Sequence, residues 1–136
     1  MIKGIGIDIL EKKRISLIHA KYGERFENRI LGKQEKQELK FKNKLNKTRF
    51  IANNFACKEA FSKVVGLGFS RGIALKEIEV LRDDQGKPFL SLSGKTKTIT
   101  EKTYDELHNK IVEHFGEYAG YGQQFLFNSV GELYWI

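Results

Sequence analysis

The chain has 136 residues, a net charge of +7 and one cysteine, which predicts a single domain over residues 1–136 with a hydrophobic core and no internal disulfide. A hydrophobic share of 40% excludes a disordered chain, and the lack of any apolar run near 20 residues or of a signal-peptide pattern predicts a cytoplasmic protein with no membrane partner. The charge is uneven: residues 1–68 hold 16 Lys and Arg against 7 Asp and Glu, whereas residues 69–136 hold 8 against 10, which indicates a polyanionic partner such as nucleic acid, a phosphorylated metabolite or an acidic protein.

Residues 1–11 alternate like a strand with one buried face. Isoleucines at 5, 7 and 9 share one side, and Gly4, Gly6 and Asp8 share the other. Glycines inside a strand often mark the close approach of a ligand or another backbone, and aspartate is disfavoured in strands. Asp8 therefore either caps the following helix or binds a metal ion, and this segment alone favours neither.

Residues 12–31 predict one amphipathic helix whose apolar face is formed by Ile15, Ile18, Tyr22, Phe26 and Ile30. A basic stripe lies beside that face, with Ile18 at the seam; it contains Arg14, Lys21, Arg25 and Arg29. Such a stripe is either a solvated surface or a docking site for an acidic helix. Residues 32–47 are nearly all polar and predict either a mobile surface helix or a basic arm, and no packed role is assigned to them.

Residues 49–68 predict a long central helix that ends at Gly66 and Gly68. A broad apolar arc includes Cys57, a small buried residue by expectation. The remaining side carries two alanines with Glu59 and Lys63, and because a helix this apolar is mostly buried, these two charges are the first candidates for chemistry. The alternative is that Glu59 and Lys63 form a solvent-exposed ion pair, which would stabilise the helix by only ~0.2–0.5 kcal/mol.

The second half begins with a loop at 69–75 and a hairpin at 77–82 and 89–93, joined by an Asp-Asp-Gln-Gly turn. Lys87, between Gly86 and Pro88, projects from that rigid bend. Residues 94–115 predict a helix, 116–124 a loop and 125–136 a closing hairpin that turns at 129–131. No histidine has metal-ligand spacing, so His108 and His114 are expected on the surface.

Three segments carry a family resemblance. GIGIDILE at 4–11 precedes Arg14-Ile15, RFI at 49–51 leads into FACKEAFSK at 55–63, and Gly86-Lys87-Pro88 follows an acidic turn. In this order they resemble the holo-[acyl carrier protein] synthase family of 4′-phosphopantetheinyl transferases, as does Arg29-Ile30-Leu31 with Glu35. The resemblance covers roughly residues 4–95, whereas residues 108–136 form an atypical C-terminal segment without the family's closing signature.

The resemblance implies an α+β fold, with an antiparallel sheet packed around the long central helix, and a homotrimer with active sites between subunits. It implies transfer of the 4′-phosphopantetheine arm of coenzyme A to a serine of apo-acyl carrier protein, in fatty acid biosynthesis. Asp8 and Glu59 would hold Mg²⁺, and Lys63, one turn further on, would meet the phosphates. Lys58 would be structural. The family usually has Arg or Lys where this chain has Asn54, which implies weaker phosphate binding.

Two further sets of site residues follow from the same resemblance. The coenzyme A contacts would be Arg49, Lys63, Gly86, Lys87 and Pro88. The surface that docks the acidic carrier would be Arg14, Ile18, Lys21 and Arg25. The alternative from another class is a basic nucleic-acid-binding module without catalysis. Against it, aromatic residues do not interleave with the lysines of residues 32–47 as a base-stacking surface requires, so no nucleic-acid partner is expected.

Overall fold

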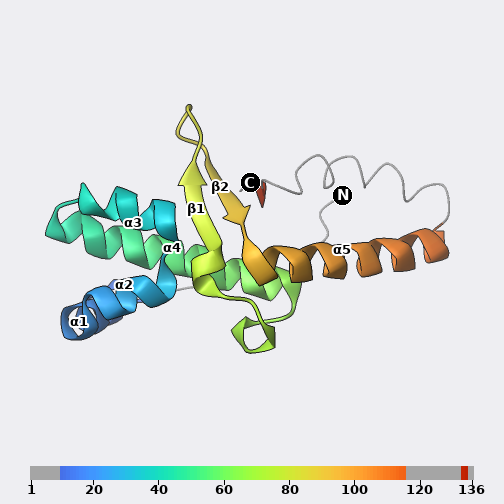
Figure 1. Cartoon of the computed structure of the whole chain (residues 1–136), viewed down its shortest axis with the longest axis horizontal. Helices are drawn as coiled ribbons and strands as arrows, with labels where there is room; N and C mark the ends of the chain where they lie inside the picture. The colour runs from blue at the N-terminus through green and yellow to red at the C-terminus, as the bar shows by residue number, and fades with distance from the viewer. Residues whose placement is uncertain (1–9, 116–132, 135–136) are drawn as a thin grey trace.

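The computed structural model describes residues 10–115 and 133–134. A small antiparallel sheet stands on one long helix, α4, with α1, α2 and α3 towards one end of that helix and α5 running out in the other direction (Figure 1). The predicted strand at 1–11 lies outside the described residues except for Leu10 and Glu11, which are not in a strand. The predicted loop at 116–124 and turn at 129–131 lie outside them as well.

Helix α4 spans Lys44–Val65 and therefore begins five residues before the predicted start. Its N-cap is Asn43, whose side-chain oxygen accepts a hydrogen bond of 3.0 Å from the backbone N–H of Asn46. The predicted end is confirmed: Gly66 has φ 73°, a left-handed conformation that glycine adopts without strain.

The prediction of one helix over 12–31 is wrong, because two helices, α1 (Lys12–Tyr22) and α2 (Glu24–Ile30), meet at Gly23. With φ 48° and ψ −127°, Gly23 has a backbone conformation that is essentially limited to glycine. His19 and Glu27 form a polar contact of 2.7 Å that ties the two helices together across the break.

Of the two alternatives for residues 32–47, the structure has the helix, and that helix packs against the rest of the chain. It is α3 (Lys33–Lys40), which lies beside the first half of α4 (Figure 1). Only Glu35 and Leu39 of this helix are buried, one turn apart, while its other residues remain in contact with solvent. A buried stripe of only two residues, one of them a glutamate, does not give the apolar periodicity by which packed helices are recognised in a sequence.

The predicted hairpin is confirmed. Strands β1 (Ile78–Arg82) and β2 (Pro88–Leu92) pair antiparallel, with Arg82 opposite Pro88, and β3 (Leu133–Tyr134) pairs with the outer side of β2. The turn is ordered by the Asp83 carboxylate, which accepts hydrogen bonds from the backbone N–H groups of Gln85 and Lys87.

Short 3-10 turns, η1 (Phe69–Arg71) and η2 (Leu75–Glu77), replace most of the predicted loop before the hairpin. Helix α5 (Gly94–Phe115) follows the hairpin with the predicted bounds.

The core consists of two clusters joined by α4. The first lies among α1–α3 and the first half of α4, and contains Ile15, Ile30, Leu31, Leu39, Ile51 and Ala52. The second lies under the hairpin and contains Phe61, Val65, Ile73, Ile78, Val80 and Leu90. The α+β class with a sheet on a central helix is therefore confirmed. Within residues 10–115 and 133–134, no helix combines the length and apolar character needed to span a bilayer.

Candidate active site

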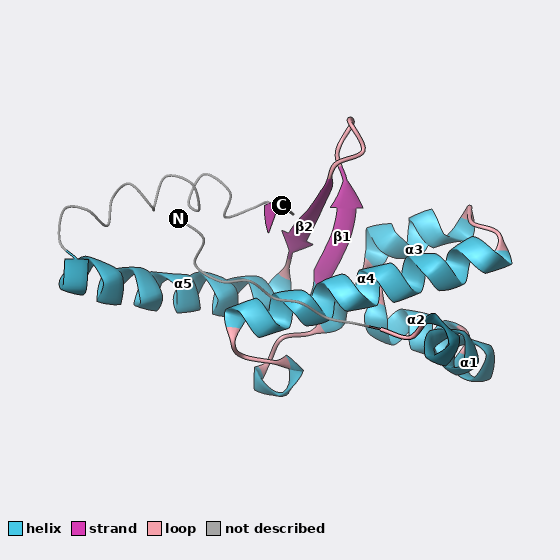
Figure 2. Cartoon of the chain, turned by 180° about the vertical axis from the view of Figure 1, so that it is seen from behind, coloured by secondary structure: helices cyan, strands magenta, loops and turns pink. Residues whose placement is uncertain are grey.

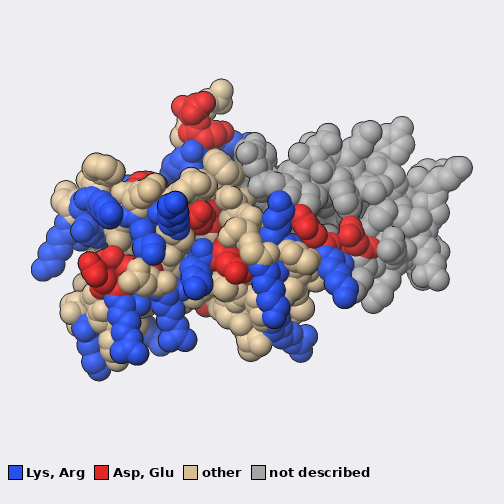
Figure 3. Space-filling view, in the orientation of Figure 1, with Lys and Arg blue, Asp and Glu red and all other residues tan. Residues whose placement is uncertain are grey.

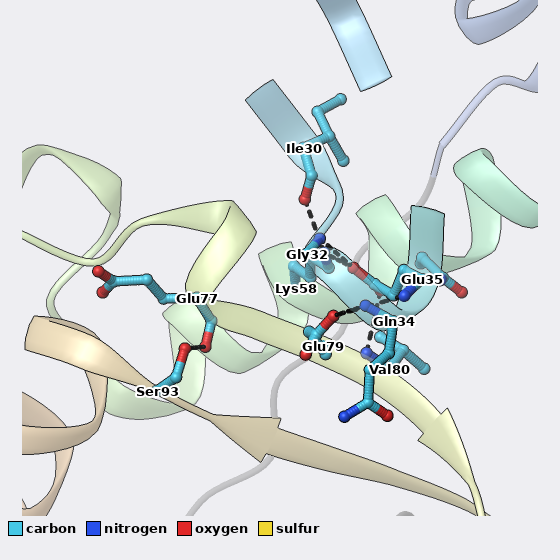
Figure 4. A network of polar contacts seen from close by, with 10 residues as sticks. Ile30, Gly32, Gln34, Glu35, Lys58, Glu77, Glu79, Val80 and Ser93 are labelled. Carbon is cyan, nitrogen blue, oxygen red and sulfur yellow. Dashed lines mark hydrogen bonds and ion pairs between the residues drawn. The ribbon is translucent and has the colours of Figure 1, made fainter. Parts of the chain in front are cut away.

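The best-connected polar group among the described residues is the carboxylate of Glu35 on α3, which is fully buried. It accepts four hydrogen bonds, whose donors lie before α3, on α4 and on β1: Gly32 N at 2.8 Å, Asn54 Nδ2 at 2.9 Å, Lys58 Nζ at 2.5 Å and Val80 N at 3.0 Å. Figure 4 shows Glu35 with Gly32, Lys58 and Val80 around it. Lys58 also donates to the carbonyl oxygen of Ile30 at the end of α2. These contacts, here called the Glu35 hub, connect α2, α3, α4 and β1.

The buried charged residue on α4 is not one of the two that the periodicity predicts. Periodicity pointed to Glu59 and Lys63, but Lys63 is exposed and Glu59 half-buried, whereas Lys58 is fully buried. Burial lowers the pKa of Lys58, and the neighbouring Glu35 carboxylate opposes that shift. The interpretation of Lys58 as structural is confirmed. Asn54, expected to affect phosphate binding, is 4% exposed and donates its side-chain amide to Glu35.

Glu59 lines an open cleft of about 870 Å³ between α1, α2, α4 and the 3-10 turns, here called the Glu59 cleft. Two of the predicted carrier-docking residues, Ile18 and Arg25, line the same cleft. Its apolar lining includes Phe26, Phe55, Phe69, Ile73 and Leu75. The structure thus brings together a carboxylate, a cation and an apolar floor from segments far apart in the sequence.

Arg49 lines a second cleft, of about 520 Å³, between α3, α4 and β1, here called the Arg49 cleft. Its other polar lining consists of Glu38, two cations and four side-chain amides, namely Lys42, Arg82, Asn43, Asn46, Asn53 and Asn54. Guanidinium and amide N–H groups are the donors that bind phosphate oxygens in proteins. This cleft therefore has the chemistry expected for an anionic ligand.

Other predicted site residues line neither cleft. Gly86, Lys87 and Pro88 lie at the far end of the hairpin, which stands away from α4 in both Figure 1 and Figure 2. Lys63 is exposed in the last turn of α4. Asp8, the predicted partner of Glu59 in binding metal, lies outside the described residues. Among the residues that are described, no group of three or more His, Cys, Asp or Glu could hold a metal ion.

The basic stripe on α1 and α2 is exposed as predicted. Arg14, Lys21 and Arg25 are all exposed, and Ile18 between them is partly buried. Figure 3 shows Lys and Arg side chains concentrated over this end of the molecule. The stripe is therefore accessible to an acidic surface, and its docking role stays a prediction.

Comparison with known proteins assigns the chain to a family. The family model described as the 4′-phosphopantetheinyl transferase superfamily matches residues 4–119. This chain belongs to that superfamily. The match continues past residue 95, where the resemblance seen in the sequence ended, and stops at residue 119.

Several relatives are named holo-[acyl-carrier-protein] synthase. The protein from Halothermothrix orenii is 40% identical over 119 residues, which covers 88% of this chain and 93% of that protein. The one from Anaplasma phagocytophilum is 44% identical over 95 residues, covering 69% of this chain and 78% of the relative.

Solved structures of holo-[acyl-carrier-protein] synthases are also similar to this chain. The synthase from Neisseria meningitidis is 35% identical with a TM-score of 0.68, covering 75% of this chain and 80% of that chain. The one from Bacillus anthracis, solved in complex with CoA (3′,5′-ADP), is 42% identical with a TM-score of 0.59, and the match covers 70% of this chain and 79% of that chain.

Sequence reasoning missed the Glu35 hub, although a signal was present. The Arg29-Ile30-Leu31 run with Glu35 belonged to the resemblance, but no role was inferred for the glutamate. A glutamate among lysines and glutamines is indistinguishable from a solvated residue until its donors on α4 and β1 are known.

Proposed function

We propose that this chain transfers the 4′-phosphopantetheine arm of coenzyme A to a serine of apo-acyl carrier protein, giving holo-acyl carrier protein and 3′,5′-ADP, in fatty acid biosynthesis. The observation that carries the proposal is the superfamily match over residues 4–119, accompanied by a synthase that is 40% identical over 88% of this chain. The reaction forms a bond between the serine oxygen and phosphorus and breaks the bond from that phosphorus to the leaving 3′,5′-ADP.

Asp8 and Glu59 would hold Mg²⁺. Mg²⁺ prefers oxygen ligands and usually takes one or two carboxylates, with waters and substrate phosphates completing the shell. The half-buried Glu59 carboxylate beside an open cleft fits that requirement. The ion supplies charge neutralisation at the phosphates of coenzyme A when it is bound.

The cations of the chain would bind the nucleotide end of coenzyme A. Arg49 lies in a cleft rich in cations and amides, which suits the 3′-phosphate. Lys63, one turn from Glu59 on α4, would offset the negative charge that develops on the leaving group.

The remaining predicted contacts, Gly86, Lys87 and Pro88, would act on a neighbouring chain, as in the homotrimer that the family resemblance implies. In one chain the hairpin tip stands apart from α4, so it cannot contribute to a site at Glu59 of the same chain (Figures 1 and 2). A neighbouring chain that supplies its hairpin tip would complete the site. Size-exclusion chromatography with light scattering tests this arrangement directly.

The carrier protein would dock on Arg14, Ile18, Lys21 and Arg25. Because Ile18 and Arg25 also line the Glu59 cleft, a carrier held there presents its serine close to Glu59. Charge attracts the acidic carrier, and apolar contact with Ile18 holds it. The alternative of a nucleic-acid-binding module finds no support in the relatives, which are named as synthases. We place the reaction in the cytoplasm.

The decisive experiment is intact-mass spectrometry of apo-acyl carrier protein after incubation with this protein, coenzyme A and Mg²⁺, with and without EDTA. A mass gain of one phosphopantetheine that EDTA abolishes supports both the transfer and the metal. A gain that persists in EDTA contradicts the metal requirement alone. No gain from a protein shown by circular dichroism to be folded contradicts the transfer.

A further inference from the structure

The turn between α3 and α4 carries two strongly exposed apolar side chains, Phe41 and Leu45, of which Phe41 also lines the Arg49 cleft. We call residues 40–47, Lys-Phe-Lys-Asn-Lys-Leu-Asn-Lys, the α3–α4 tip. Phe41 is 91% exposed and Leu45 is 73% exposed, the two highest values among the exposed large hydrophobic residues of the described chain. Single exposed apolar residues are ordinary on protein surfaces. Two of them four positions apart in the chain, at the turn that joins α3 and α4, form a small group, here called the exposed cluster of Phe41 and Leu45.

Cations surround this cluster. Between residues 40 and 49 the chain has four lysines and Arg49 but no aspartate or glutamate. The nearest acidic partner is Glu38, whose carboxylate lies 2.9 Å from Lys42 Nζ. Lys40 and Lys44 are exposed. The tip therefore presents two apolar side chains within positive charge, at one extreme end of the molecule (Figure 1).

We propose that the α3–α4 tip docks on an anionic lipid surface. Lysines near a bilayer are attracted by acidic headgroups, and apolar side chains that project between them enter the boundary between headgroups and acyl chains. Although Phe41 lies at the edge of the Arg49 cleft, 91% of its surface is exposed, so it can enter a bilayer without a preformed pocket. The basic stripe on α1 differs, because its central Ile18 is half-buried in a cleft and offers little apolar surface to a bilayer.

The experiment is co-sedimentation of the full chain with vesicles of phosphatidylcholine alone and with vesicles containing one-third phosphatidylglycerol. Binding is expected only to the anionic vesicles and should weaken as salt is raised. Phe41→Ser and Leu45→Ser should each reduce the partition coefficient by about tenfold, because each removes a large apolar side chain from the lipid contact. The matched control is Val64→Ser, which changes an apolar residue that is 37% exposed near the other end of α4 and should bind like the parent.

Three results would overturn the inference. The first is no binding of the parent chain to anionic vesicles. The second is binding that Phe41→Ser and Leu45→Ser leave unchanged, which would place the lipid contact elsewhere. The third is a loss of oligomeric mass in these variants by light scattering, which would make the tip a contact between copies of the chain. Thermal unfolding of each variant verifies that the fold is intact. Lipid binding is measured without coenzyme A or carrier protein, so its failure leaves the proposed reaction untouched. Leu45→Ser tests the tip independently of the Arg49 cleft, which Phe41 lines and Leu45 does not.

Discussion

The ammonium group of Lys58 lies 2.5 Å from the carboxylate of Glu35, and neither side chain has any exposed surface. This ion pair lies between the Glu59 cleft and the Arg49 cleft. Ile30, whose carbonyl oxygen Lys58 contacts, lines the Glu59 cleft, while Asn54 and Val80, which donate to Glu35, line the Arg49 cleft. The pair therefore fixes the position of α4 between the proposed carrier site and the proposed nucleotide site.

Removing either partner of this pair should destabilise the fold. Glu35→Gln leaves a buried ammonium group without its counter-ion, and Lys58→Met leaves a buried carboxylate with three donors instead of four. Breaking a buried ion pair from one side typically costs about 3–5 kcal/mol. We expect a loss of that size in the free energy of unfolding of each single variant, measured by urea denaturation.

The double variant Glu35→Gln/Lys58→Met is the control, because it leaves no unpaired buried charge. Its loss of stability should be clearly smaller than the sum of the two single losses, so the cycle gives a favourable coupling. Strictly additive losses would mean that the two side chains stabilise the fold independently. That result would contradict a direct interaction across the 2.5 Å contact.

The elements that the sequence predicts correctly are those with a local signal. Helix α4 ends at Gly66, and the hairpin turns where Asp83 can bond to its own backbone. The break at Gly23 was missed because the apolar positions of α1 and α2 keep nearly the same spacing across it. The packing of α3 was missed because one of its two buried residues is Glu35, three of whose four donors lie 19 to 45 positions away along the chain.

The site was only partly predictable for a related reason. Lys58 and Glu59 are neighbours in the sequence and lie about 100° apart around the helix. The apolar arc of α4 is so broad that periodicity cannot tell which of the two charges faces the interior. Glu35 decides this, because its carboxylate is the partner that makes burial of Lys58 tolerable. That information comes from another helix.

Glu59→Gln should abolish most of the transfer while leaving the fold intact. The amide keeps the shape of the side chain but loses the negative charge that a divalent cation requires. We expect the initial rate of holo-carrier formation to fall by about 100-fold or more, the size typical of losing a charge-stabilising group at a reacting phosphate. The matched control is Glu101→Gln on α5, which lines neither the Glu59 cleft nor the Arg49 cleft and should retain the parental rate. A Glu59→Gln enzyme with the parental rate would remove this residue from the site.

Arg25→Glu should lower the catalytic efficiency with the carrier protein as substrate and leave the binding of coenzyme A unchanged. Reversing a charge on the exposed stripe beside the Glu59 cleft opposes the approach of an acidic partner. We expect kcat/KM for the carrier to fall by about tenfold, with the KM for coenzyme A unchanged. Lys97→Glu makes the same change of charge at an exposed position of α5 and should have little effect. Equal losses in the two variants would indicate a non-specific effect of net charge instead of docking.

The start of α5 should make the stability of the protein depend on pH. Hydrogen bonds from the side chain and the backbone N–H of Thr96 lower the pKa of Glu77 from its usual value of 4.5. The backbone bond is 2.8 Å long and places a carboxylate against the first turn of α5, where the helix dipole favours negative charge. The ionised form of Glu77 is therefore bound more favourably in the folded chain than in the unfolded one.

The sign follows from linkage. A carboxyl group with a lowered pKa in the folded state contributes its stability above the unfolded pKa of 4.5 and loses it as the pH falls through the lower folded value. Glu77→Gln should therefore unfold at a lower temperature than the parent at pH 7, with a loss of about 1 kcal/mol or less, and the difference should shrink towards zero in acid. Glu101→Gln, further along α5, serves as the control and should show no such convergence. A Glu77→Gln deficit that stayed constant from pH 7 down to pH 2 would mean that packing, rather than the charge at the helix start, stabilises this junction.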